Sequence, residues 1–140
     1  MMRTIAAALL VAPIALTAVE SSAAPRTPAP EGAAVYIIEP TDGATVPTTF
    51  TVKFGLKNMG VAPAGTDKDA TGHHHLLVDR DLPPLDEPMG GDIMHFGGGQ
   101  TEAQVTLPPG THTLQLLLGD MNHVPHDPPV YSEKITVNVE

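Results

Sequence analysis

Cysteine is absent from the 140-residue chain. This absence excludes disulfide bonds, thiol catalysis, iron–sulfur clusters, blue-copper centres and a lipid anchor on cysteine. Serine is nearly as scarce, because Ser132 is the single serine beyond residue 24, and it stands in no nucleophile-elbow motif. We therefore expect neither a serine hydrolase nor a catalytic site built on a thiol.

Aromatic and basic residues are also few. The chain has no tryptophan, 3 phenylalanines and 2 tyrosines. Phe50, Phe54 and Tyr131 fall on predicted core faces, so the chain lacks the exposed rings that a sugar-binding platform needs.

The chain is strongly acidic. It has 7 lysines and arginines against 16 aspartates and glutamates, which gives a net charge of −9. Such a surface is a poor partner for nucleic acid and for anionic membranes.

The N-terminus has the pattern of a signal peptide. Arg3 precedes an apolar stretch, residues 5–19, that is shorter than the roughly 20 residues of a membrane-spanning helix, and small residues allow cleavage after Ala24. We expect residues 1–24 to be removed, residues 25–34 to form a disordered linker, and residues 35–140 to form one domain. The mature protein is then periplasmic or extracellular, and no second apolar segment would hold it in a membrane.

Alternating apolar residues predict an all-β domain. The period of two is clearest at 50–56 and 111–119, and further short strands are expected at 35–38, 73–79, 93–96, 101–107 and 131–139. The 15 prolines and 13 glycines mark the turns between them. Six or seven short strands at this spacing predict an immunoglobulin-like two-sheet β-sandwich.

Histidine is the unusual residue type, with 7 copies that all follow residue 24. On a strand, His73 and His75 project to one side and His74 to the other. In immunoglobulin strand order, 73–79 is the antiparallel neighbour of 111–119. The triple histidine then faces the segment after 111–119, and the loop around residues 94–99 emerges at the same end. We therefore expect one histidine-rich rim, built from Asp120, His123, His126, Met94, His95 and the triple histidine.

This rim predicts a metal site. The leading ligands are His73, His75, His95 and His123, with Asp120 as a ligand or as the residue that orients one. The secondary candidates are His74, Met94, Met121 and His126, the last on the flexible side of its loop. Imidazole suits copper(II) and zinc, and a methionine thioether would add copper(I).

Two histidines favour a structural interpretation. His112 follows a tight turn on the leucine face of its strand, so we predict that it bonds backbone at a strand corner. His74 lies on the same face of its strand as Leu76 and Val78, so its side chain is expected to point toward apolar neighbours. A hydrogen-bonded network without any ion remains the alternative for the rim itself.

Several strings carry a family resemblance. They are TGHHHLLVD at 71–79, HFGGGQT at 95–101, LPPGTHTL at 107–114, and LGD at 118–120 followed by His123. Together they resemble an uncharacterised bacterial family, the domain of unknown function 4399. The resemblance implies a bacterial, exported protein and brings no established activity.

Two functions are consistent with these residues. The first is an exported metal-binding protein, a chaperone, buffer or sensor for copper or zinc, whose partner is the ion and, second, another exported protein. We expect no enzyme, since a hydrolytic zinc site also needs a general base and a substrate cleft. The second is a non-catalytic immunoglobulin-like interaction module with a structural histidine network.

Overall fold

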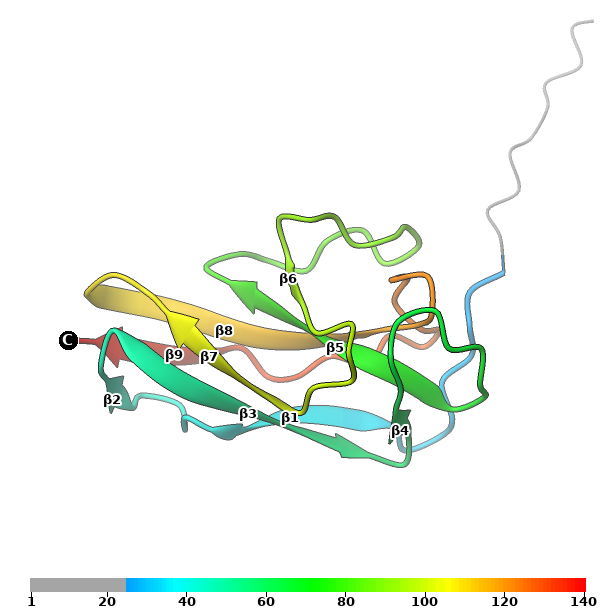
Figure 1. Cartoon of the computed structure of the whole chain (residues 1–140), viewed down its shortest axis with the longest axis horizontal. Helices are drawn as coiled ribbons and strands as arrows, with labels where there is room; N and C mark the ends of the chain where they lie inside the picture. The colour runs from blue at the N-terminus through cyan, green and yellow to red at the C-terminus, as the bar shows by residue number, and fades with distance from the viewer. Residues whose placement is uncertain (1–24) are drawn as a thin grey trace, which may run out of the picture.

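The structure is a computed structural model that describes residues 25–140. These residues form no helix and two sheets, one of order β1-β3-β7 and one of order β2-β9-β8-β5-β4 with β6 paired to β5. The sheets face each other (Figure 1), which confirms the predicted immunoglobulin-like β-sandwich. The strands are β1 Ala34–Glu39, β2 Thr45–Val46, β3 Thr49–Lys57, β4 Gly60–Val61, β5 Thr71–Val78, β6 Met94–His95, β7 Glu102–Thr106, β8 Gly110–Gly119 and β9 Ile135–Val139.

The predicted signal peptide, residues 1–24, lies outside the described residues. Within residues 25–140, no helix has the length and hydropathy of a membrane span.

Residues 25–34 differ from the disordered linker that we predicted. The Arg26 side chain donates hydrogen bonds to the main-chain oxygens of Pro125, at 3.2 Å, and of His126. Ala34 already belongs to β1. The prolines of this segment suggested an unstructured chain, but the loop between β8 and β9 offers acceptors that only the folded protein brings within reach.

The inner faces of the two sheets form the main core. Alternate residues of β3 and β8 point into it, as the period of two predicts. Each fully buried side chain of this kind contributes roughly 1.5–3 kcal/mol to folding. The buried residues are Phe50, Val52 and Phe54 of β3 and Leu114, Leu116 and Leu118 of β8.

The last strand begins at Ile135 rather than at Tyr131. Tyr131 forms an isolated bridge with Leu117 and is 48% exposed, so the prediction that its ring faces the core is wrong. Ser132 takes the inward position instead. It is buried, and its hydroxyl accepts a hydrogen bond from the Leu116 main chain at 2.8 Å, which turns the neighbouring tyrosine outward.

β5 is buried on both faces. His74 and Leu76 point into the main core, whereas Leu77 joins a second cluster with Ile93 and Leu117 on the outer face. The chain between β5 and β6 arches over that outer face (Figure 1). This cover explains why all three consecutive histidines are buried, because a strand with one solvated face would expose every second residue.

His112 is structural, as predicted, and has a partner that the sequence did not indicate. Its Nε2 donates to the Pro108 main-chain oxygen at 2.8 Å, and its Nδ1 to the Asp79 carboxylate at 2.6 Å. The bonds to Asp79 and Pro108 raise the pKa of His112 above its ordinary value. The doubly protonated ring therefore joins the end of β5 to the turn before β8.

Replacing His112 by Ala should lower the melting temperature more at about pH 5.5 than at about pH 9. A histidine whose pKa is raised by folding stabilises the fold below the unfolded-state value of about 6.5, and that contribution is lost as the pH rises through the folded-state value. Thermal unfolding of the parent and His112→Ala across this range measures the difference. If the loss of melting temperature in His112→Ala were equal at both pH values, or larger at high pH, the raised pKa of His112 would be contradicted.

Candidate metal centre

The pairing of β5 with β8 brings two histidines together at one end of the sheet. Its register sets His73 opposite Gly119 and His75 opposite Leu117. Because alternate residues of a strand share a face, the rings of His73 and His75 lie side by side, with centroids 4.6 Å apart. His74 points the other way, into the core.

The loop after β8 adds a third imidazole, that of His123. Asp120 shapes this loop, because its Oδ1 accepts hydrogen bonds from the main chains of Asn122 and Val124 at 2.8 and 3.0 Å. Its Oδ2 accepts one from the Thr27 hydroxyl at 2.6 Å. His123 has a φ of 64°, a left-handed conformation that the surrounding contacts must enforce.

The Asp120 carboxylate stays charged in this position. Its burial acts to raise the pKa, but the hydrogen bonds from Thr27 and from the loop main chain outweigh that effect and hold the pKa of Asp120 below its ordinary value. With both oxygens engaged, Asp120 orients the loop that carries His123.

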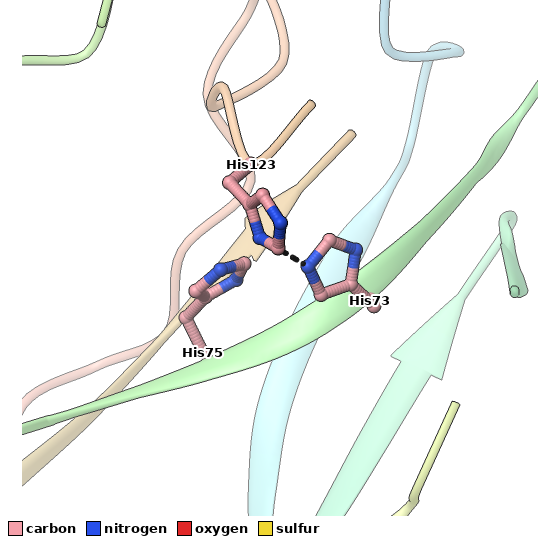
Figure 2. Close-up of side chains that lie close together, drawn as sticks. All are labelled: His73, His75 and His123. Carbon is pink, nitrogen blue, oxygen red and sulfur yellow. Dashed lines mark hydrogen bonds between the residues drawn. The ribbon is translucent and has the colours of Figure 1, made fainter. Parts of the chain in front are cut away.

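The three rings converge on one point (Figure 2). His73 Nε2 and His123 Nδ1 are 3.0 Å apart, and the His123 ring stands at 88° to that of His75, with centroids 5.6 Å apart. One ring nitrogen from each of the three lies within 4.8 Å of the other two. Nitrogens bound to one tetrahedral ion at about 2.0–2.1 Å lie about 3.3 Å from one another, so the widest pair here would have to approach by up to about 1.5 Å to share an ion.

His73 and His75 are held in the neutral form. Burial, assisted by the proximity of His123, lowers the pKa of His73 to about 4. Burial, assisted by His73 and His123, lowers the pKa of His75 to about 3. Near neutral pH both rings therefore carry the lone pair that a metal ion requires.

Three of the six buried histidine ring nitrogens that have no hydrogen-bond partner among residues 25–140 belong to this group, and the other three belong to His74 and His126. Among the described residues, Nδ1 of His73 and both ring nitrogens of His75 are buried and have no hydrogen-bond partner. The large majority of buried side-chain polar atoms in proteins are paired, and an unpaired one costs about 1–3 kcal/mol. These nitrogens therefore have unused capacity to bind a ligand.

Two glycines make room for the histidine rings. A Cβ on Gly119 would lie 2.6 Å from Cε1 of His75, and a Cβ on Gly72 would lie 2.9 Å from Cε1 of His126. A side chain at Gly119 would require the His75 ring to move, and one at Gly72 would also overlap the Gly119 main-chain oxygen, 2.8 Å away. The glycines of the GHHH and LGD strings, Gly72 and Gly119, thus allow the histidine rings to approach the main chain closely.

His95 lies at the edge of the group. It is exposed on β6, opposite His75 in register, and its ring stacks on that of His75 with centroids 6.0 Å apart. Its centroid is 5.1 Å from that of His123. His95 is therefore adjacent to the three converging rings without belonging to the tight set.

The secondary candidates lie elsewhere. His126 was predicted on the flexible side of its loop, and this is wrong, because it is fully buried and its Nε2 donates to the Thr71 main-chain oxygen at 3.0 Å. His74 packs its ring 5.0 Å from that of Phe54. Met94 is 41% exposed, and Met121 borders a separate pocket beside residues 66–69.

Sequence reasoning missed two residues of this region. Met89 lines a pocket of about 160 Å³ with His95 and His123, and its main chain donates to the His123 oxygen at 2.9 Å. Thr27, which bonds Asp120, is 93 positions away in the chain. Met89 stands in a proline-rich loop and Thr27 in the segment taken for a linker, so no periodicity pointed to either.

Comparison with known families matches residues 52–140 to the family described as a domain of unknown function (DUF4399). The chain belongs to this family. The matched residues include all 7 histidines. They also include the loop that begins at Asp120.

Comparisons with curated proteins and with solved structures give no further information on function. No curated protein matches the chain. Among solved structures, the chain is similar to the fibronectin(III)-like modules of Clostridium thermocellum CbhA, with 14% identity and a TM-score of 0.38 over 75% of this chain and 92% of that one. At this level the likeness supports no inference about function.

Replacing Gly119 by Ala should destabilise the metal-free protein by about 1–3 kcal/mol, because the new methyl group would overlap His75 and force its ring to move. Chemical unfolding measures the change. Gly91→Ala is the matched control, since a Cβ there would meet nothing within 4 Å. If both variants were as stable as the parent, the proposed crowding at Gly119 would be wrong.

Proposed function

We propose that this protein is an exported metal-binding β-sandwich that holds copper or zinc through His73, His75 and His123. The observation that carries this proposal is the convergence of three imidazoles from two separate segments, with ring nitrogens within 4.8 Å of one another. Imidazole is a common ligand for both metals.

The unpaired nitrogens favour an ion over a purely structural network. A network that held loops together would satisfy the ring nitrogens of its members. His75 is 1% exposed, yet neither of its ring nitrogens has a partner among the described residues. A metal bond would occupy the lone pair on this ring and offset the free energy lost by burying it.

The setting favours storage or transfer of the ion over catalysis. The pocket at the group holds about 160 Å³, enough for a few water molecules or one small ligand. Asp120 is engaged in the loop and is not free to act as a general base. Exposed His95 at the rim offers an entry point where an ion could be passed to a partner, so a chaperone, buffer or sensor is the role we propose.

Untagged, metal-stripped protein should bind copper(II) or zinc at neutral pH with a dissociation constant well below about 1 mM. Replacing His73, His75 or His123 by Ala should each weaken binding by at least about tenfold, since even the loss of an outer partner costs that much. Isothermal titration calorimetry measures the affinities, and circular dichroism verifies that each variant is folded.

His112→Ala is the control for these titrations, because its bonds to Asp79 and Pro108 join other parts of the fold. It should bind the ion as the parent does. If the parent binds neither ion, or if folded His73→Ala and His75→Ala proteins bind as well as the parent, the metal proposal fails and the interaction module takes its place.

Export is the second part of the proposal. Cleavage after Ala24 would leave Arg26 and Thr27, which contact the histidine-bearing loop, in the mature protein. The mature N-terminus should therefore fall within residues 23–25. Intact-mass spectrometry of protein recovered from outside the cytoplasm tests this, and a mass that still includes Met1 would rule it out.

A further inference from the structure

Met89 lies beside two of the three converging histidines, His75 and His123. Its methyl carbon Cε lies 2.9 Å from the position that a Cβ on Gly119 would take, and Cε1 of His75 lies 2.6 Å from that same point. Its main chain is hydrogen-bonded to His123. Met89 therefore lies near the buried His75 ring and also lines the pocket of His95 and His123.

The other described methionines do not share this position. Met94 is 41% exposed, Met121 borders the pocket near residues 66–69, and Met59 packs against the main core. Met89 is half-buried, and its apolar surroundings are Leu77, Ile93 and Leu117. These side chains hold one flank of the methionine in an environment with little water.

We propose that Met89 supplies a thioether ligand beside His73, His75 and His123, and that the site holds copper(I) in preference to zinc. This rests on the proposed function, because it names the ion that the same group of histidines would hold. Thioether sulfur is a soft ligand that selects copper(I), whereas imidazole accommodates either metal.

Charge supports the same choice. The four ligands are neutral, and Asp120, the carboxylate whose charge acts on His73, already accepts hydrogen bonds at both oxygens. Two of the histidines are buried, so a bound ion would be largely removed from water. The cost of burying an ion rises steeply with its charge, and a monovalent ion is therefore favoured where the ligands offer no compensating negative charge.

Met89→Leu separates the sulfur atom from the packing. Leucine and methionine are similar in volume, so the contacts with Leu77, Ile93 and Leu117 should persist and the variant should fold. Met94→Leu is the matched control, because it removes a methionine sulfur from the neighbouring strand β6.

The experiment loads parent and variants with copper(I) without oxygen, in competition with a chromophoric copper(I) chelator, and with zinc in a parallel titration. In Met89→Leu, copper(I) affinity should fall at least about tenfold while zinc affinity stays within about threefold. Met94→Leu should match the parent for both ions. X-ray absorption at the copper edge should show a sulfur neighbour in the parent and in Met94→Leu, and none in Met89→Leu.

The outcomes test the role of Met89 separately from the proposed histidine metal site. If the parent binds copper or zinc through its histidines but Met89→Leu keeps both the copper(I) affinity and the sulfur signal, the role of Met89 is overturned and the histidine site stands. The same holds if the parent prefers zinc. If the parent binds no metal at all, both are overturned.

Discussion

The antiparallel pairing of β5 with β8 is the interaction on which the rest of this structure depends. It joins the longest described strand, β8, to the strand that carries the triple histidine, and it sets His73 opposite Gly119. A slip of one residue would exchange the faces of all three histidines and put His74 in the place of its neighbours. The leucines of β8 resist such a slip, because they would leave the main core. The register that packs the core is therefore the register that assembles the histidine group.

Burying these histidines works against stability. Polar rings at 0% and 1% exposure displace the apolar side chains that would otherwise fill the space beneath the β5–β6 loop. All of their ring nitrogens except the Nε2 of His73, which is hydrogen-bonded to His123, lose water without gaining partners, and this burial lowers the pKa of His73 and of His75. Such conflicts between local chemistry and global packing are concentrated at functional sites, where the fold tolerates them because a ligand relieves them. A bound ion would relieve this one.

Contacts far apart in the sequence fix the third histidine. His123 reaches the other two only because its loop folds back around the Asp120 carboxylate, and Asp120 is itself bonded by Thr27 from the start of the described chain. The segment after the predicted cleavage position is therefore part of the support of the site. The position of His123 depends on the N-terminal segment as well as on the sheet.

The sequence by itself determined most of the strands and the end of the sandwich at which the histidines meet, but not the short strands β2 and β4 or the start of β9. Side-chain alternation is a local property, so Phe50, Val52 and Phe54 indicated an inward face without knowledge of their partners. Immunoglobulin order then indicated that β5 and β8 are neighbours. Tertiary structure alone decided which loop residues join the group. His123 enters it and His126 is bonded to Thr71 instead, Tyr131 turns outward beside the buried Ser132, and Met89 comes to lie near His75. Loops have no repeating pattern to read, because their conformations follow from hydrogen bonds and steric limits between residues distant in the chain, and these exist only once the sheets have packed.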